Sequence, residues 1–178
     1  MVRLVVAHTG LLDPAHLTAA RRLLVGVFAD ELRDDDWEHC LGGLHALLWD
    51  GDELVGHAAL VTRRLLHGGR ALRTGYVEGV AVRADVRRRG HGGTLLAALE
   101  GVAARAHEVA ALAATDEGAA FYRRRGWLPW QGPTCALTPQ GVVRTPEDDD
   151  DVFVLPLSDE PLDLHGQLTC DWRDGDLW

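Results

Sequence analysis

A basic, glycine-containing loop lies between a strand-like and a helix-like stretch near the middle of the chain. Residues 76–82 are mostly β-branched, aromatic or small, and leucines recur at helical spacing from Leu95. Glycine lets the backbone approach a ligand closely, and the first N–H groups of a helix attract anions. The pattern predicts a phosphate-binding loop; the simpler alternative is a turn with a solvated basic face. The residues predicted to hold the anion are Arg87, Arg88, Arg89, Gly90, His91 and Gly92.

This loop fits neither of the two common nucleotide-binding motifs. A Walker loop needs a lysine, which the chain lacks, and a Rossmann loop needs G-x-G-x-x-G. The loop resembles instead the coenzyme A loop of the GNAT N-acetyltransferases, [Q/R]-x-x-G-x-[G/A]. Arg87, Gly90 and Gly92 occupy its three fixed positions. The resemblance implies a GNAT fold and acetyl-CoA as the acetyl donor, without a metal.

The strand before the loop carries an acidic residue next to a glycine. Gly79 inside a strand indicates a bulge, and the resemblance implies that the pantetheine arm pairs there with the backbone of Val80, Ala81 and Val82. The N–H of Val80 is then the candidate donor to the thioester oxygen as it becomes anionic. Glu78 is the candidate base, acting directly or through a water, because burial would raise its pKa. The alternative is an exposed acid on the polar face of the strand.

A tyrosine further along the chain is the candidate general acid. The segment Gly118–Trp127 resembles the GNAT element A-x-x-[F/Y]-Y-x-x-x-G-[F/W], in which the tyrosine stands by the departing sulfur. The resemblance implies that Tyr122 donates a proton to the thiolate, while Phe121 packs in the core. The alternative for Tyr122 is packing on an amphipathic helix.

The acidic excess of the chain lies in its last fifth. The net charge is −9, yet residues 1–143 are balanced, whereas residues 144–178 hold 11 acidic residues and 2 arginines. The run Glu147–Asp151 leads directly into an apolar, strand-like stretch, which predicts a folded acidic region that attracts cations. Within this run, Asp149–Asp151 are expected to be merely solvated.

Several further segments resemble the actinobacterial aminoglycoside 2'-N-acetyltransferases, and the resemblance extends along the chain. The segments include Asp36-Trp-Glu-His, Arg125–Trp130 and Cys170–Trp178. The resemblance implies transfer of acetyl to the 2' amine of an aminoglycoside by direct attack in a ternary complex, and a homodimer. It implies that the acceptor binds Glu31, Asp36, Glu78, Gly79, Ala113, Glu147, Asp148, Asp176 and the terminal Trp178. Two alternatives stay open: a GNAT enzyme acting on another metabolite or protein amine, and a non-catalytic acyl-CoA-binding module.

Length and composition fit one α/β domain over residues 1–178. The chain is 47% hydrophobic, and no apolar run approaches the ~20 residues of a membrane span. The start of the chain does not fit a signal peptide. Three cysteines without a C-x-x-C pair and nine histidines without H-E-x-x-H predict no metal site. We therefore expect a cytoplasmic protein without a membrane or nucleic-acid partner.

The expected fold is a mixed, mostly antiparallel sheet flanked by helices, in the order βααβββαβαββ. Asp13 caps a helix to about Phe28, with Leu17, Leu24 and Phe28 on one face. The other elements expected are strand 3–8, helix 34–40, a meander of strands at 44–49, 54–66 and 71–82, a helix after the loop, strand 109–114, helix 116–125, and two strands near 128–138 and 152–158.

Overall fold

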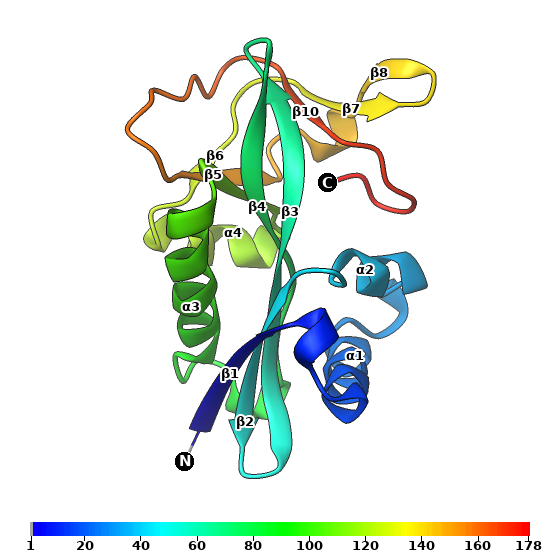
Figure 1. The fold of residues 1–178 in the computed structure, drawn as a ribbon, viewed down its shortest axis with the longest axis vertical. Coiled ribbons are helices and arrows are strands. Elements are labelled where there is room, and N and C mark those ends of the chain that lie inside the picture. Colours follow the sequence, from blue (N-terminus) through cyan, green and yellow to red (C-terminus); the bar gives the residue numbers. More distant parts are fainter. Residues whose placement is uncertain (1) are drawn as a thin grey trace. The chain divides into compact units, whose positions relative to one another are not determined.

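The computed structural model describes residues 2–178 and shows a mixed α/β fold (Figure 1). The order of elements agrees with the sequence prediction as far as the fourth helix. The elements to that point are β1 (Val2–His8), α1 (Pro14–Phe28), α2 (Asp34–His39), β2 (Leu44–Asp50), β3 (Glu53–His67), β4 (Arg70–Val82), α3 (His91–Ala106), β5 (Val109–Ala113) and α4 (Asp116–Arg124). The later strands are β6 (Leu128–Pro129), β7 (Thr134–Thr138), β8 (Gly141–Arg144), β9 (Val152–Pro156) and β10 (Leu168–Cys170).

Helix α1 begins where the sequence predicts. The Asp13 side chain accepts a hydrogen bond of 2.8 Å from the N–H of Ala15, and Pro14 occupies the first helical position. A proline is favourable there because its missing N–H would have no partner inside the helix. Leu24 is fully buried in the core, against which the half-buried Leu17 and Phe28 pack, so the predicted apolar face is confirmed.

The prediction of a single strand over residues 128–138 is wrong. The segment of residues 130–133 separates β6, which pairs with β9, from β7, which pairs with β8 and β10. Pro133 has no N–H to donate to a neighbouring strand. Gly132 passes so close to another loop that an added Cβ would lie 2.1 Å from the carbonyl oxygen of Gly166. The short strands β8 and β10 were not expected.

The strands form a sheet in the order β6-β9-β5-β4-β3-β10-β7-β8, and β2 pairs with both β1 and β3. The β4–β5 and β7–β10 pairs are parallel, whereas β1–β2, β2–β3, β3–β10, β5–β9, β6–β9 and β7–β8 are antiparallel.

Contacts divide the chain into two compact units, which we call the first and second units. The first comprises Met1–Val61 and Val77–Val102, and the second comprises Thr62–Tyr76 and Ala103–Trp178. One domain over the whole chain stays a prediction.

The core of the first unit lies on both faces of its strands. On one face, α1 and α2 lie against β2 and β3 (Figure 1). The buried side chains of these two helices include Leu24 and Trp37. On the other face, Leu95 of α3 fills the space above Gly56, where a Cβ would lie 3.0 Å from its Cδ1. Among residues 2–178, no helix is long and apolar enough to cross a membrane.

Candidate functional site

The predicted phosphate loop leads directly into α3. Gly90 has a φ of +86°, and its carbonyl accepts from the N–H of Thr94 at 3.0 Å. Helix α3 begins at His91, so Gly92 lies within the first helical turn and not in the loop before it. The first N–H groups of a helix have no partner within the helix, and they carry partial positive charge.

The three arginines of this loop are exposed and add charge beside the helix start. Arg88 has a φ of +61°, which is uncommon for a residue with a side chain. Arg87 donates from Nε to the carbonyl of Val82 at 3.1 Å, and Arg89 donates from Nη2 to the carbonyl of Asp85 at 3.4 Å. Arg87 therefore ties the loop back to the strand that precedes it. The arrangement is suited to an anion.

The predicted reacting end lies in β4. Gly79 has a φ of +54°, which agrees with the irregular backbone expected at this position. A Cβ added there would lie 2.7 Å from Sγ of Cys40 and 3.3 Å from Cε1 of His57, so only glycine fits without rearrangement. Glu78 is half-buried and not exposed, whereas a raised pKa for its carboxyl stays a prediction. Val80 and Val82 are half-buried, and Ala81 between them is buried.

Two buried histidines lie behind this strand, and sequence reasoning missed them. The carbonyl of Gly79 accepts from Nδ1 of His57 at 2.7 Å, and Nε2 of His57 lies 3.0 Å from Nδ1 of His45. Nε2 of His45 then lies 2.9 Å from Oγ1 of Thr9. We call Thr9, His45, His57 and Gly79 the histidine chain. A detectable signal was a histidine inside the apolar stretch of each strand of one hairpin, β2 and β3.

Burial keeps both histidines uncharged. It lowers the pKa of His45 to about 4, with a further contribution from His8. It also lowers the pKa of His57 to about 4; the hydrogen bond to Gly79 opposes this shift and His45 adds to it. Because both pKa values lie well below neutral, the side chains of the histidine chain are uncharged at pH 7.

Asp36 and Glu31, predicted for acceptor binding, lie in the helical segment of the first unit. Asp36 is half-buried, and its Oδ2 accepts from the N–H of Arg33 at 2.8 Å, so this carboxylate stabilises the start of α2. Cys40 at the other end of α2 approaches Gly79, which brings the helix of Asp36 close to β4. Glu31 is exposed at the end of the 3₁₀ turn Ala29–Glu31, and its role stays a prediction.

Tyr122 lies in α4 of the second unit, in an aromatic cluster. Its ring centroid is 5.9 Å from that of Trp127 and 6.3 Å from that of Phe153. Burial raises the pKa of Tyr122 to about 12, which keeps the phenol protonated at neutral pH. The residue therefore packs in this cluster with its phenol protonated at neutral pH, and its role as general acid stays a prediction. Ala113, the last residue of β5, is exposed.

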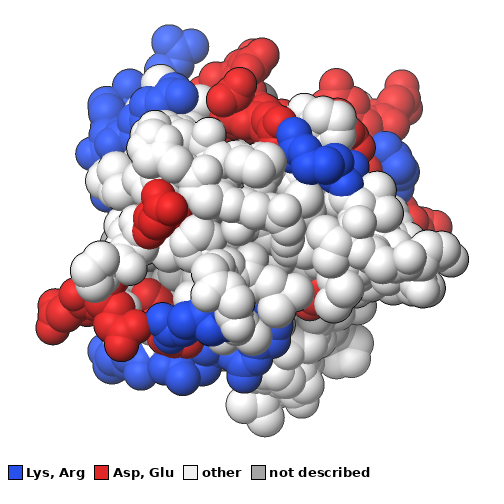
Figure 2. Space-filling view, turned by 90° about the horizontal axis from the view of Figure 1, so that it is seen from above, with Lys and Arg blue, Asp and Glu red and all other residues white. Residues whose placement is uncertain are grey.

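Two acidic residues predicted for acceptor binding, Glu147 and Asp176, lie within electrostatic reach of a third, Asp148, in the second unit. Burial raises the pKa of Asp148 to about 6, and the charges of Glu147, Asp151 and Asp176 add to the shift. Glu147 and Asp148 belong to the 3₁₀ turn Pro146–Asp148. On the face shown in Figure 2, acidic side chains gather in patches, with basic patches beside several of them. A turn with crowded carboxylates is suited to a polycation.

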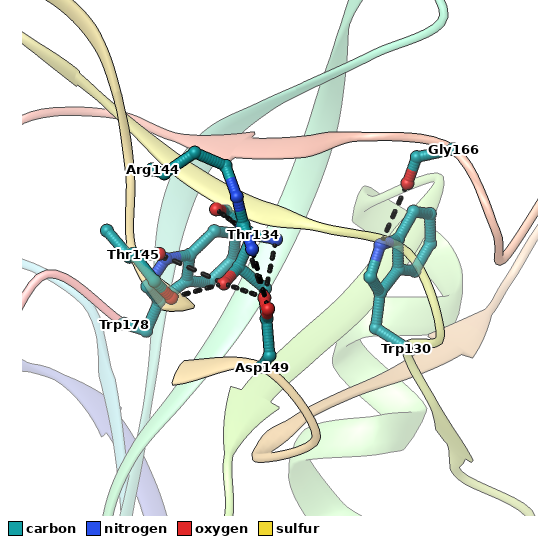
Figure 3. Close-up of polar contacts among 7 residues, drawn as sticks. All are labelled: Trp130, Thr134, Arg144, Thr145, Asp149, Gly166 and Trp178. Atoms are coloured by element: carbon teal, nitrogen blue, oxygen red, sulfur yellow. Dashed lines mark hydrogen bonds and ion pairs between the residues drawn. The ribbon is translucent and has the colours of Figure 1, made fainter. Parts of the chain in front are cut away.

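Asp149 holds this region together, so the expectation that it is merely solvated is wrong (Figure 3). Its Oδ1 accepts from the N–H of Thr134 at 2.9 Å and from its hydroxyl at 2.7 Å, and its Oδ2 accepts from Nη2 of Arg144 at 2.6 Å. These contacts hold the pKa of Asp149 well below its usual range, with Arg144 as the largest cause. The hydroxyl of Thr145 donates to that of Thr134 at 3.0 Å, and Nε1 of Trp178 donates to Thr145 at 3.0 Å.

We call Trp178, Thr145, Thr134, Asp149 and Arg144 the carboxylate chain. It fixes two predicted acceptor residues, because Trp178 is a member and Asp148 precedes Asp149. Its Trp178 end is also held by arginine side chains. Arg173 donates to the main-chain oxygen of Trp178 at 2.9 Å, and the buried Arg63 donates to the carbonyl of Leu177 at 2.8 Å. The segment that carries Asp176 is thereby fastened on both sides.

A comparison with known protein families identifies the family to which this loop and strand point. Residues 11–129 match the family described as Acetyltransferase (GNAT) domain. The chain belongs to the GNAT acetyltransferases. A relative from Mycolicibacterium fortuitum, an aminoglycoside 2'-N-acetyltransferase, is 48% identical over 97% of this chain and 90% of its own length. This protein is therefore an enzyme, and the reaction class of its family is acetyl transfer.

Solved structures agree on the fold of this acetyltransferase. Escherichia coli ElaA has a TM-score of 0.62 at 19% identity, with 86% of this chain and 99% of ElaA covered. A GCN5-related N-acetyltransferase from Kribbella flavida has a TM-score of 0.60 at 22% identity and covers 75% of this chain. The chain spans only 34% of the length of that second protein. In residues 2–178 of the enzyme, no group of three or more His, Cys, Asp or Glu side chains is placed to hold a metal ion.

Proposed function

We propose that this enzyme transfers acetyl from acetyl-CoA to the 2' amine of aminoglycosides, by direct attack in a ternary complex, and so confers antibiotic resistance. The observation that carries the proposal is the group of crowded carboxylates at Glu147, Asp148 and Asp176. The activity of the M. fortuitum relative, which matches along nearly the whole chain, supports the same acceptor. Aminoglycosides are polycations, and carboxylates bind ammonium groups through charge-assisted hydrogen bonds.

Acetyl-CoA is the proposed donor, and the residues for it lie in the first unit. The diphosphate binds the residues from Arg87 to Gly92, where exposed arginines and helix N–H groups attract an anion. The pantetheine arm pairs with the backbone of Val80, Ala81 and Val82. The positive φ of Gly79 supports this role, because the irregular backbone frees the strand locally from regular pairing.

Three groups carry the proposed chemistry. Glu78, directly or through a water, removes a proton from the attacking amine. The N–H of Val80 stabilises the thioester oxygen as it becomes anionic. Tyr122 gives its proton to the sulfur of coenzyme A as the C–S bond breaks; with a pKa of about 12 the phenol is protonated before the reaction.

The residues proposed for acceptor binding are mostly acidic, and each unit carries some of them. Asp36 and Glu78 with Gly79 are proposed from the first unit, with Glu31 as a further contributor. From the second unit come Ala113, Glu147, Asp148, Asp176 and Trp178. Since the pKa of Asp148 is raised to about 6, its charge develops as the pH rises through this value. Acceptor affinity should therefore increase between pH 5 and 7.

We also propose that the enzyme is cytoplasmic and forms a homodimer.

The direct test is the product formed from tobramycin and acetyl-CoA. We expect a mass increase of one acetyl group by mass spectrometry, and NMR should place the group on the 2' nitrogen. Tyr122→Phe is the matched variant, because it keeps the ring and removes the proton; it should lower kcat while coenzyme A still binds. A panel of metabolite amines and peptides runs in parallel. Preference for one of those amines, or acetylation away from the 2' position, would show that the acceptor is wrong.

A further inference from the structure

The hydrogen bond from His57 acts on the peptide unit that holds the proposed oxyanion donor. The carbonyl of Gly79 and the N–H of Val80 belong to one planar trans peptide, so they point in opposite directions. His57 Nδ1 lies 2.7 Å from that carbonyl oxygen. Fixing the oxygen therefore fixes the direction of the N–H on the opposite edge of the same plane.

The carbonyl at the end of the histidine chain determines where every proton lies. A carbonyl only accepts, so His57 must carry its proton on Nδ1, which leaves Nε2 as an acceptor. His45 must then donate from Nδ1 to His57, which leaves its own Nε2 as an acceptor. The hydroxyl of Thr9 lies 2.9 Å from this Nε2 and 3.2 Å from the carbonyl of Gly43, and the neutral His45 assigns the hydroxyl proton to the shorter contact. The N–H of Gly42 donates to Thr9 in turn, at 3.0 Å. All four donors point towards Gly79.

This direction excludes a role as a proton relay from the acceptor amine. The atom of His57 that faces Gly79 already carries a proton, so it cannot take one from that side. If Nε2 of His45 accepted a further proton, it could no longer accept the hydrogen bond from the hydroxyl of Thr9. The buried histidines therefore orient a group and do not serve as a base.

We propose that His57, held by His45 and Thr9, is a positioning residue that orients and polarises the Gly79–Val80 peptide for oxyanion stabilisation. The proposal rests on the proposed function of the Val80 N–H. Gly79 gives the backbone freedom at this point, because its φ of +54° and its lack of Cβ allow peptide rotations that other residues resist. A donor on the carbonyl removes that freedom.

Burial makes the orienting bond strong. His45 and His57 are both 0% exposed, and in such surroundings a hydrogen bond is electrostatically stronger than in water. Hydrogen bonds in series also polarise one another, so a donor on the carbonyl makes the N–H of the same peptide a better donor. Charge develops on the thioester oxygen only in the transition state, and the effect should therefore be on kcat.

Three variants test the proposal. His57→Leu removes the donor, and we expect kcat for tobramycin acetylation to fall roughly 10- to 100-fold, somewhat less than when an oxyanion donor is deleted outright. The Kd of coenzyme A should change less than about threefold, since the ground state uses this peptide little. His57→Asn places an amide N–H near the position of Nδ1 and should recover at least a third of the wild-type kcat. His67→Leu is the matched control, because His67 also contacts a backbone carbonyl, that of Gln167 at 3.0 Å; its kcat should stay within twofold.

A second measurement is independent of the acceptor. Two-dimensional ¹⁵N spectra of the histidine side chains should show a proton on Nδ1 of both His45 and His57, and the amide signal of Val80 should shift in His57→Asn. An Nε2–H tautomer of His57 would overturn the proposal, as would equal kcat values for His57→Leu and the wild type. If wild-type enzyme fails to acetylate tobramycin, the proposed function fails; kcat for slow hydrolysis of acetyl-CoA and the tautomer spectra then still decide the role of His57. If His57→Leu does not fold, the spectra and His57→Asn decide it.

Discussion

Each compact unit contains a chain of hydrogen-bonded side chains behind predicted site residues, but the two chains end on different acceptors. The histidine chain of the first unit ends on the carbonyl of Gly79, a neutral group. The carboxylate chain of the second unit ends on Asp149, which pairs with Arg144 at 2.6 Å. In both, each residue of the chain donates one hydrogen bond towards the final acceptor, so that acceptor sets the proton positions.

The difference between the two chains follows from burial. His45 and His57 are fully buried, where an unpaired charge would be very costly, and their pKa values are lowered so that they stay neutral. The side chains of Asp149 and Arg144 are 34% and 45% exposed, which leaves both ions partly hydrated. A buried polar chain is therefore neutral, whereas a chain that reaches the surface can end in an ion pair. The neutral histidine chain is suited to orienting a peptide, and the carboxylate chain is suited to holding a loop in place.

The largest expected effect on stability comes from Asp149→Asn. The substitution removes the charge that accepts from the Thr134 N–H and hydroxyl and from Arg144, and it turns an amide NH₂ towards the guanidinium. Hydrogen bonds to a charged group contribute about 1.5–3 kcal/mol, and the exposed part of the ion pair adds little, so we expect a loss of about 3 kcal/mol. Urea unfolding at pH 7 measures it.

The neighbouring Asp150→Asn is the matched control for this change, because Asp150 is exposed and asparagine tolerates its φ of +75°. Its free energy of unfolding should stay within about 0.5 kcal/mol of the wild type. Equal effects of the two substitutions would contradict the anchoring role of Asp149.

The second prediction separates the two chains by pH. The folded pKa of each buried histidine is lowered from 6.5 to about 4, so the contribution to stability is fully present above pH 6.5 and is lost as the pH falls towards 4. Over this range only the unfolded chain takes up the proton. The pKa of Asp149 is also lowered, from 3.8, so the carboxylate chain loses its contribution only below about pH 4. Between pH 6.5 and 5, each histidine should account for a loss of about 2 kcal/mol.

The measurement compares urea unfolding at pH 6.5 and 5 in two backgrounds. Asp148 acts in the opposite direction, because its raised pKa lets the folded state bind a proton first. The comparison is therefore made in Asp148→Asn, with and without His45→Leu. The variant with leucine should lose less stability on acidification. The same slope in both proteins would show that His45 does not titrate on unfolding.

The sequence predicts those parts of the fold and of the site that depend on interactions within a few residues. Asp13 and Pro14 begin a helix because a side-chain acceptor and a fixed φ act within one turn, and Gly90 marks the loop for a similar reason. Gly79 also stands out, since a glycine inside an apolar strand is unusual. These are interactions between residues close in the chain, which pattern and spacing describe well.

Long-range partners are not predictable in this way. His57 lies 22 residues from Gly79, and Asp149 lies 15 residues from Thr134. Periodicity assigns a residue to a face of a strand but does not identify the group opposite it. The same reason explains β10, a strand of three residues that is defined by its pairing with Leu66 and His67 of β3 and with β7. The proposed arrangement of donor and acceptor residues depends on such long-range placement.

The smallest expected stability effect tests two adjacent acids against each other. Asp148 is crowded by Glu147, Asp151 and Asp176, so its ionised form is unfavourable in the folded state, whereas Asp149 is stabilised by its donors. Asp148→Asn should therefore raise the free energy of unfolding at pH 7 by less than about 1 kcal/mol, as is common where a binding site tolerates strain. Its affinity for tobramycin, measured by calorimetry, should fall several-fold and lose the increase between pH 5 and 7. If this substitution instead destabilises the protein as much as Asp149→Asn, Asp148 is a structural anchor, and the carboxylates of this turn do not divide into a fastening residue and a binding residue.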